Sequence, residues 1–339
     1  MIEPSVPAGP ARFVLAPMEG LLNAQLRQTL TGAAQYDWCV TEFVRVTQTL
    51  LPPRAYLRSA PELSTDAKTA SGVPVRVQLL GSDPSCMADN AAHLVNLNPA
   101  GIDINFGCPA PVVNRHGGGA ILLNEPAQLD RIVSAVTRAV DGRVPVTAKM
   151  RLGVHDKSRA LEAAHALAGA GAELLVVHAR TKDEGYRPPA HWEWVAHIAA
   201  AINLPVVANG EIWSVEDYVN CRAVSGTNDV MLGRGAIADP FLVERIRDRL
   251  AGREVRPAAR DWPRVIALVL QYWEIMRKDP TATFAPGRVK QWLNQLRRTF
   301  LQAAAVFQQL KQVREPRAFD VQLKSLLSEA GNHANGLRA

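Results

Sequence analysis

Four cysteines occur in this chain, and one of them lies where a thiol could do chemistry. Cys39, Cys86 and Cys221 fall within expected strand or helix segments, where a cysteine is most often a small, inert hydrophobe. Cys108 instead stands between a glycine and a proline, in an expected loop directly after an apolar run. A thiol with an ordinary pKa of about 8.5 is mostly protonated at neutral pH. Cys108 could therefore act as a general acid or as a nucleophile.

Polar side chains recur at the ends of the apolar runs in the first three quarters of the chain. A polar group in an apolar strand is costly unless it has a partner, so this recurrence indicates a shared site. Lys149 could form a Schiff base, could stabilise an anionic ring by its charge, or could simply pair with Glu42 or Asp103. The amides of Gln78 and Asn105 favour a bound heteroaromatic ring over an imine.

Two glycine-containing strand ends indicate a phosphate site. Asn209-Gly210 ends one apolar run, and Gly233-Arg234-Gly235 follows the next. Glycine N–H groups and a nearby helix N-terminus can hold a phosphate, and an arginine adds a charge-assisted contact. This arrangement predicts a cofactor that carries a phosphate.

Eight short apolar or β-branched runs must position these side chains. Several are almost continuously hydrophobic, as expected for parallel strands that are buried on both faces. Helical patterns lie between most of them, at 88–97, 126–140, 158–169 and 193–202, and this alternation predicts a closed TIM (β/α)₈ barrel. An open, doubly wound sheet is the alternative, which the absence of Gly-x-Gly-x-x-Gly after the first run makes less favourable. The runs are 13–18, 38–43, 75–80, 101–106, 144–150, 173–178, 205–209 and 229–232.

The character of the chain changes after about residue 250. Residues 251–260 are polar and basic and predict a linker, and the segments 262–277, 287–300, 301–313 and 319–330 have helical spacing with little β-branching. We therefore predict a barrel domain over 11–250 and a small helical domain over 257–330. Between residues 251 and 320, 13 lysines and arginines stand against 6 acidic residues, which suggests a polyanionic partner or a solvated basic surface.

Composition excludes several classes of protein. No apolar run approaches the ~20 residues that span a bilayer, and the first ten residues do not resemble a secretory signal, so we expect a cytoplasmic protein without a membrane segment. The cysteines are too few and too widely separated for a disulfide scaffold or a zinc site, and no metal is expected.

Taken together, the motifs resemble those of the tRNA-dihydrouridine synthase family, and the resemblance covers the whole chain. The shared motifs are Ala16-Pro17-Met18, Asn105-x-Gly-Cys108-Pro109, Lys149-x-Arg151, His178-x-Arg180-Thr181 and Asn209-Gly210. Further segments look like the C-type bacterial branch, which modifies uridine 16 in the D-loop of tRNA. These segments are Thr41–Arg45, Gly117–Ala120, Asn209–Trp213 and Lys290–Leu293.

The resemblance implies an FMN cofactor that NADPH reduces, a hydride transfer to carbon 6 of uracil, and a cysteine that protonates carbon 5. By motif match Cys108 is that acid. Physical chemistry is consistent with this arrangement, since a cofactor within the barrel and a loop thiol can deliver hydride and proton from different directions. A target base in folded RNA must swing out of its stack to reach them.

The resemblance also implies the residues that contact the cofactor and the tRNA. We expect a monomer whose basic helical region holds the tRNA backbone. The expected cofactor contacts are Pro17, Met18, Glu19, Gln78, Lys149, His178, Asn209, Gly210, Glu211, Gly233 and Arg234. The expected tRNA contacts are Arg45, Asn105, Arg151, Tyr186, Arg288, Lys290, Gln291 and Arg297.

Two other functions fit parts of the pattern. A flavin-dependent oxidoreductase of a free pyrimidine, such as dihydroorotate or uracil, would share the barrel and the cofactor site. Such an enzyme has no use for a basic C-terminal region, which disfavours it. A non-catalytic RNA-binding protein on a barrel scaffold has no need of both Cys108 and Lys149.

Overall fold

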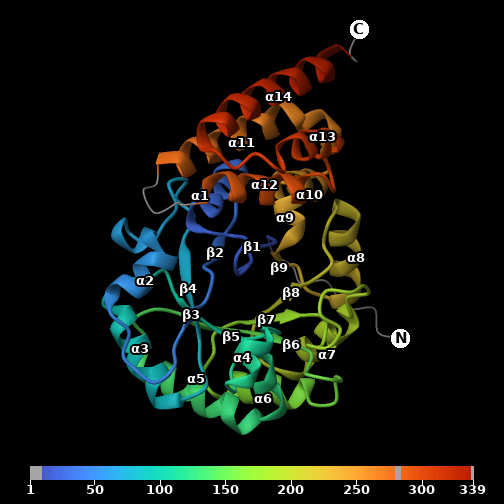
Figure 1. Ribbon diagram of the computed structural model, residues 1–339. Helices are drawn as coiled ribbons and strands as arrows, with labels where there is room; N and C mark the ends of the chain where they lie inside the picture. The colour runs from blue at the N-terminus through green and yellow to red at the C-terminus, as the bar shows by residue number, and fades with distance from the viewer. Residues whose placement is uncertain (1–9, 279–283, 337–339) are drawn as a thin grey trace. The chain divides into compact units, whose positions relative to one another are not determined.

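A closed ring of eight parallel strands forms the body of the molecule in a computed structural model that describes residues 10–278 and 284–336 (Figure 1). The ring closes because β1 (Phe13–Leu15) pairs with β2 (Trp38–Val40) on one side and with β9 (Val230–Leu232) on the other. The predicted TIM barrel is confirmed, and the open-sheet alternative is wrong. The remaining strands of the ring are β4 (Val75–Leu80), β5 (Ile102–Phe106), β6 (Val146–Arg151), β7 (Leu175–His178) and β8 (Val206–Asn209).

The ring contains one irregularity between its second and third strands. β2 pairs with the start of β4, and a separate two-residue strand, β3 (Val44–Arg45), pairs with its end. The single run predicted at 38–43 is therefore interrupted, and Thr41 lies in the gap. Its hydroxyl accepts a hydrogen bond from the backbone N–H of Gln78 at 3.1 Å, which ties the interrupted segment to β4.

Helices link the strands around the outside of the ring (Figure 1). Most of the barrel helices begin with helix-starting residues. Pro84 opens α3 behind the N-cap Asp83, whose carboxylate accepts from the Cys86 N–H, and Pro126 opens α5. The barrel helices are α2 (Pro53–Ser59), α3 (Pro84–Val95), α4 (Pro111–Arg115), α5 (Pro126–Val140), α6 (Ala160–Gly169), α7 (Trp192–Ala201) and α8 (Val215–Ser225).

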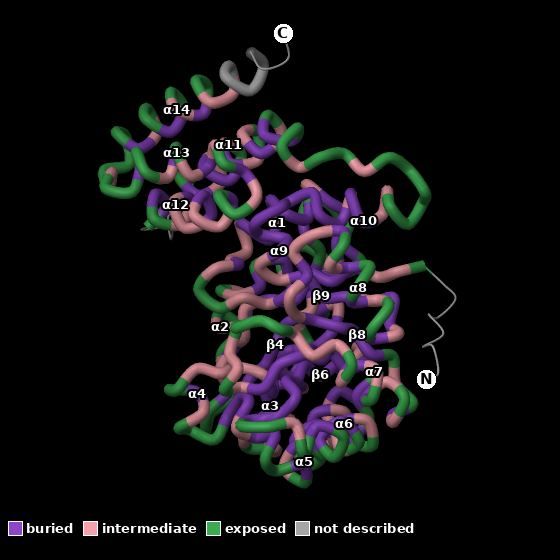
Figure 2. The backbone as a smooth tube through the Cα atoms, turned by 90° about the vertical axis from the view of Figure 1, so that its right-hand side faces the viewer, coloured by how far each residue is buried: buried purple, intermediate pink, exposed green. Residues whose placement is uncertain are grey.

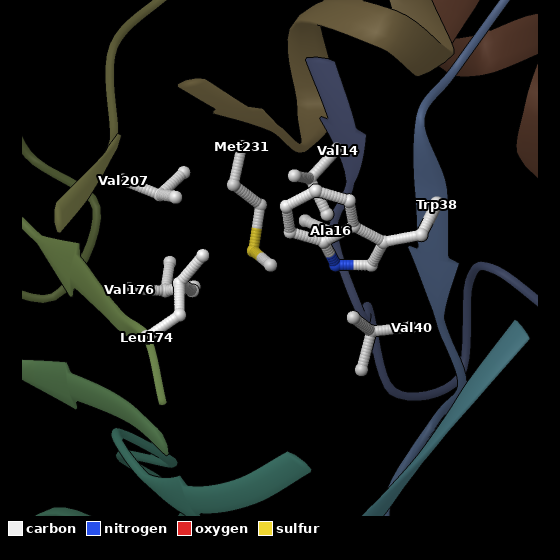
Figure 3. Close-up of a cluster of buried hydrophobic side chains, with 8 residues drawn as sticks. All are labelled: Val14, Ala16, Trp38, Val40, Leu174, Val176, Val207 and Met231. Atoms are coloured by element: carbon white, nitrogen blue, oxygen red, sulfur yellow. The ribbon is translucent and has the colours of Figure 1, made fainter. Parts of the chain in front are cut away.

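Strand alternation divides the barrel residues into an outer set and an inner set. The outward residues are apolar and pack against the helices, so the strands are mostly buried (Figure 2). Inward residues of β1, β2 and β9, with the first inward residue of β7 and of β8, are also apolar and converge in one cluster (Figure 3). The inward residues of β4, β5 and β6 are instead polar. The barrel interior is therefore apolar on one side and polar on the other. The apolar cluster consists of Val14, Ala16, Trp38, Val40, Leu174, Val176, Val207 and Met231.

Packing groups the described chain into two compact units. The first unit holds the eight strands of the ring. The second holds Gly20–Gln35 with α1 (Ala24–Ala33), Trp213–Val215, and the chain from Arg234 onward. The domain ranges predicted from the sequence, 11–250 and 257–330, remain a prediction. The helices of the second unit beyond α1 are α9 (Arg234–Ala238), α10 (Leu242–Leu250), α11 (Trp262–Lys278), α12 (Ala285–Leu296), α13 (Leu301–Leu310) and α14 (Pro316–Gly336).

Three tryptophans form the centre of the second unit, and all are almost completely buried. The indole N–H of Trp292 donates to the carbonyl of Ile237 at 3.1 Å, and that of Trp273 donates to Asp320 at 2.6 Å. Trp262 opens α11 beside the 3₁₀ helix Ala258–Asp261, where the predicted linker ends. Among residues 10–278 and 284–336, no helix has both the length and the apolar character needed to cross a bilayer.

Candidate functional site

A buried ammonium group lies at the polar side of the barrel interior. Lys149 stands on β6, and its Nζ donates a 3.0 Å hydrogen bond to Oδ1 of Asn209 on β8. Because β7 lies between these strands, the lysine reaches past Val176, its neighbour in register. Asn209 Nδ2 in turn donates to the carbonyl of Met231 at 2.7 Å, so the amide presents its oxygen to the ammonium. The motif therefore folds into a fixed lysine–asparagine pair.

Burial sets the ionisation of this ammonium. Lys149 is only 9% exposed, and desolvation together with the nearby charge of Arg151 lowers its pKa to about 8. The carboxyl of Asp103 and the thiol of Cys108 act in the opposite direction. Lys149 thus remains mostly protonated at neutral pH, and a buried positive charge suits an anionic ring. Asn209 is thus a hydrogen-bond partner of Lys149, and Asp103 acts on the ammonium through its charge.

A chain of hydrogen bonds crosses the polar side of the barrel from β6 to β4 and back to β5. The Thr147 hydroxyl lies 2.7 Å from Asp103 Oδ1, and Asp103 Oδ2 accepts from Gln78 Nε2 at 2.6 Å. Gln78 Oε1 then accepts from Asn105 Nδ2 at 2.7 Å. All four side chains are buried. The resemblance implied that Gln78 contacts the cofactor and that Asn105 contacts the tRNA. In the structure the two side chains are neighbours in one network.

The far end of this network holds the backbone of Cys108. Asn105 Oδ1 accepts from the N–H groups of Gly107 and Cys108, both at 2.9 Å. The carbonyl of Cys108 accepts from Asn114 Nδ2 at 2.9 Å and from the Ala120 N–H at 3.1 Å. Both polar backbone groups of Cys108 are therefore fixed, so the loop after β5 holds its thiol in a defined place.

A glycine permits the close approach that closes this loop. Gly119 has φ +69°, and a Cβ at this position would lie 2.7 Å from the Cys108 carbonyl oxygen and 3.1 Å from the Cys108 Cβ. No side chain fits there, and the left-handed backbone also favours glycine. The 3₁₀ helix Gly119–Asn124 can consequently pack directly against the cysteine loop.

The Cys108 thiol is half-buried, and its surroundings keep it protonated. Burial raises its pKa above the ordinary value, and the nearby Glu19 carboxylate acts in the same direction. A backbone hydrogen bond at Ala110 and the positive charges of Arg151 and Arg45 oppose the shift. Of the four free cysteines, Cys108 is the one that lies in a loop at the ends of the strands. A protonated, positioned thiol is suited to general-acid chemistry.

Arg151 ties the loops after β5 and β7 together at the end of β6. Its Nε donates to the Gly107 carbonyl at 2.8 Å, and its Nη1 donates to the carbonyls of Thr181 and Gly185 at 2.9 and 2.8 Å. The guanidinium carbon also lies 5.2 Å from the ring centre of Tyr186. Only 1% of Arg151 is exposed, and its hydrogen bonds hold the loops together. The resemblance implied a contact with tRNA and did not predict this structural role.

Two rings stand side by side at the end of β7. The rings of His178 and Tyr186 have centres 5.9 Å apart, and 54% of Tyr186 is exposed. An exposed aromatic ring beside a strand end can stack on a base. Gly210 follows β8 with φ +116°, and a Cβ there would approach the imidazole of His178 to 3.0 Å. The glycine in Asn209-Gly210 is therefore required by the histidine of the neighbouring strand.

The end of β8 is stabilised by an ion pair. Arg180, which is fully buried, pairs with the carboxylate of Glu211, and Glu211 has φ +60°. The indole N–H of Trp192 donates to the Gly210 carbonyl at 3.0 Å. These contacts fix the turn after β8, in which Gly210 lies close to the His178 imidazole.

The other predicted residues fall into two groups. Pro17, Met18 and Glu19 follow β1, Arg45 ends β3, and Gly233 follows β9, so all five lie at carboxyl ends of strands in the first unit. Arg234 begins α9 and belongs to the second unit. There Arg288 and Gln291 donate to the Gly20 carbonyl, and Lys290 donates to the carbonyls of Lys311 and Val313. Arg297 is exposed, with its guanidinium 5.9 Å from the ring of Phe307.

The sequence did not reveal three residues that hold the site. Asp103 looked only like a possible partner of Lys149, yet it binds Gln78. Asn114 looked like part of a glycine-rich loop, yet its amide joins Cys108 to Ile121. Gly119 was one of three consecutive glycines. The one available signal was a polar residue, Asp103, at an inward position of a buried strand. In the described part of the chain, no group of side chains could hold a metal ion.

Comparisons with known proteins point to one family. The model of the family described as Dihydrouridine synthase (Dus) matches residues 14–331. A tRNA-dihydrouridine(16) synthase of Ralstonia nicotianae is 53% identical over 305 residues, which cover 90% of this chain and 93% of that one. Proteins of the same name from Cupriavidus necator and Shewanella oneidensis are 52% and 41% identical, covering 93% and 96% of this chain and 97% and 99% of their own lengths.

Solved structures share the barrel at low sequence identity. Histamine dehydrogenase from Rhizobium sp. 4-9 matches with a TM-score of 0.54 and 16% identity, over 78% of this chain and about half (49%) of that longer one. Morphinone reductase in complex with tetrahydroNAD matches with a TM-score of 0.50 and 14% identity, over 72% of this chain and 88% of that one. These likenesses show the fold. The family match and the close relatives go further: this chain belongs to the dihydrouridine synthase family, oxidoreductases that act on a CH–CH group, as its motifs predicted.

Proposed function

We propose that this protein reduces uridine to 5,6-dihydrouridine in the D-loop of tRNA, at position 16. The relatives at 41–53% identity have this activity in their names, and they match the chain over nearly its whole length. The structure supports the proposal by one observation above all. The Cys108 thiol lies in a loop near the buried ammonium of Lys149. Burial keeps the thiol protonated, and hydrogen bonds to the Cys108 backbone hold the residue in place.

We assign the proton of the reaction to Cys108. The thiol gives its proton to carbon 5 of the uracil, and burial keeps that proton in place at neutral pH. Bonds from Asn105 and Asn114 to the Cys108 backbone keep the sulfur at one position, so the proton arrives at one carbon. The raised pKa also disfavours the thiolate, which limits side reactions of a nucleophilic sulfur.

The strand ends fit a flavin, and we propose FMN with NADPH as reductant. When bound, reduced FMN supplies a hydride to carbon 6 of the uracil. Gln78, Lys149, His178 and Asn209 offer amide, ammonium and imidazole groups from four inward strand positions, a set that matches the polar edge of an isoalloxazine ring. Lys149 would hold negative charge on that ring. The remaining proposed contacts are Pro17, Met18, Glu19, Gly210, Glu211, Gly233 and Arg234.

We propose that tRNA contacts both units of the chain. In the first unit Tyr186 would stack on the extruded base, and Arg45, Asn105 and Arg151 would lie beside it. In the second unit Arg288, Lys290, Gln291 and Arg297 would contact phosphates. The protein would act as a monomer in the cytoplasm, where tRNA and NADPH are both present.

The deciding experiment maps dihydrouridine in tRNA from cells that lack this gene. We expect dihydrouridine to disappear from position 16 and to return when the wild-type gene is restored. The purified protein should be yellow with an FMN spectrum and should reduce unmodified tRNA in the presence of NADPH. Unchanged modification at position 16, or turnover of free uracil or dihydroorotate without any turnover of tRNA, would contradict the proposal.

A further inference from the structure

The polar side of the barrel interior contains a buried carboxyl group to which the proposed reaction gives no role. Asp103 is 1% exposed and faces inward from β5, between Gln78 on β4 and Thr147 on β6. Inward positions of the opposite strands carry apolar residues, including Val14 and Val176. An apolar side chain would fill this position without the cost of burying a carboxyl group. The presence of an acid here therefore points to a task other than packing.

We propose that Asp103 is a positioning residue that sets the place of the Cys108 thiol through the chain Asp103–Gln78–Asn105. The links are 2.6 Å from Gln78 Nε2 to Asp103 Oδ2, 2.7 Å from Asn105 Nδ2 to Gln78 Oε1, and 2.9 Å from the Cys108 N–H to Asn105 Oδ1. The consequence for turnover rests on the proposed function, whereas the consequence for the thiol does not.

The direction of every hydrogen bond in this chain is determined. Backbone N–H groups can only donate, so the Asn105 oxygen must face Gly107 and Cys108, and its nitrogen must face Gln78. Gln78 then presents its oxygen to Asn105 and its nitrogen to the position of Asp103, two residues earlier on β5. A buried amide nitrogen there needs an acceptor, and Asp103 Oδ2 is that acceptor.

The chain needs an acceptor at Asp103 rather than a charge. Burial raises the pKa of Asp103, while the bonds from Gln78 and Thr147 and the charges of Lys149 and Arg76 oppose the shift. If the carboxyl takes up a proton on Oδ1, it can donate to Thr147, and the threonine hydroxyl can turn to the Ile102 carbonyl at 3.5 Å. Oδ2 still accepts from Gln78 in both protonation states.

Two substitutions at this position separate the acceptor from the shape of the side chain. Asp103→Leu has a similar size but leaves Gln78 Nε2 buried without a partner, so Gln78 should turn and release Asn105. Asp103→Asn keeps an oxygen for Gln78 and turns its nitrogen to Thr147. The matched control is Thr147→Val, which removes the other hydrogen bond of the same carboxyl group and leaves the chain intact.

The first measurement is the alkylation rate of the Cys108 thiol by iodoacetamide across pH, in a Cys86→Ser background and without tRNA. Cys39 and Cys221 are buried and Cys86 is not, so this background isolates Cys108 among the thiols. In Asp103→Leu the released thiol should become more exposed, its pKa should fall towards the ordinary value, and the rate at pH 7.5 should rise about tenfold. Asp103→Asn and Thr147→Val should stay within about threefold of the parent.

The second measurement is turnover of unmodified tRNA by the holoenzyme. Asp103→Leu should lower kcat by about tenfold or more while KM for tRNA changes little, because a displaced acid affects the chemical step. Asp103→Asn should restore kcat. If wild-type protein does not turn over tRNA at all, the proposed function fails, and the alkylation comparison still tests the chain.

Several results would overturn the proposal. An unchanged alkylation profile in folded Asp103→Leu would show that the chain does not position the thiol. Equal loss in Asp103→Asn and Asp103→Leu would show that charge, not the acceptor, matters. If Asp103→Leu does not fold, Gln78→Met breaks the same chain at its middle link and should speed alkylation to a similar extent. A rate equal to that of the parent in that variant would also reject the proposal.

Discussion

Lys149 Nζ and Asn209 Oδ1 lie 3.0 Å apart across the polar side of the barrel, joining β6 to β8 past the strand between them. Both side chains are buried, so the pair holds a positive charge away from solvent. Such a charge opposes folding and is useful only if a bound group needs it. The pair therefore makes a prediction about stability and a second one about cofactor binding.

Lys149→Met should stabilise the flavin-free protein at pH 7 and weaken its binding of flavin. The pKa of Lys149 falls from 10.5 to about 8 on folding, so the unfolded chain binds more protons between these pH values. The wild-type free energy of unfolding should therefore rise with pH from 8 to 10.5. The variant should lack this rise and gain up to about 3 kcal/mol at pH 7.

Urea unfolding across pH measures this effect, and Lys324→Met is the matched control because Lys324 is exposed on α14. The control should change the free energy of unfolding by less than about 0.5 kcal/mol. A Lys149→Met protein that is less stable than wild type at pH 7, or that binds flavin equally tightly, would refute the assignment.

Cys108→Ala should abolish dihydrouridine formation but leave reduction of the flavin by NADPH intact. The substitution removes the proposed proton donor, whereas the backbone bonds that shape the loop remain available. Stopped-flow reduction and mass spectrometry of tRNA measure the two half-reactions separately. In wild-type protein, burial raises the pKa of the thiol. The rate of tRNA turnover should therefore stay constant past about pH 8.5, the ordinary pKa of a thiol, and decline only at higher pH. Normal tRNA turnover in Cys108→Ala would remove the acid role.

Gly119→Ala should both destabilise the protein and impair turnover. The new methyl group would lie 2.7 Å from the Cys108 carbonyl oxygen, at a backbone φ of +69°. We expect a loss of about 2–4 kcal/mol in the free energy of unfolding, since the loop must move as well as accept the strained backbone. Gly142→Ala is the control, because Gly142 has a similar φ of +67° and open space around it. That control should lose only about 1 kcal/mol and keep full activity. Equal effects of the two substitutions would show that backbone strain alone matters.

Replacing Arg288, Lys290 and Arg297 together by glutamine should weaken tRNA binding and reduce its salt dependence. Each lost phosphate contact lowers the slope of log K against log salt by about 1. Replacing Arg131 and Arg138, which are exposed on α5, by glutamine provides a control in the first unit, compared per charge removed because it loses two charges rather than three. Filter binding at several salt concentrations would measure both proteins. An equal loss of slope in the control would mean that these three residues have no special place in binding.

The sequence determined most of the architecture by itself. Eight apolar runs with helical patterns between them predicted the ring, and runs such as 75–80 match their strands, because the alternation of buried strand and covering helix is local in the chain. The choice of site residues stays a prediction, although its basis is simple. Cys108 and Lys149 follow from one rule, that parallel barrel strands end on the same face.

Tertiary structure alone decided how these residues are held. Asp103, Gln78 and Thr147 come from three strands, and their hydrogen bonds depend on the register between those strands, which no periodicity encodes. Likewise Gly119 is needed only because its backbone meets that of Cys108 in space, eleven residues earlier in the chain. Pattern in a sequence reports burial and local conformation, whereas partners across strands are set when the whole barrel closes.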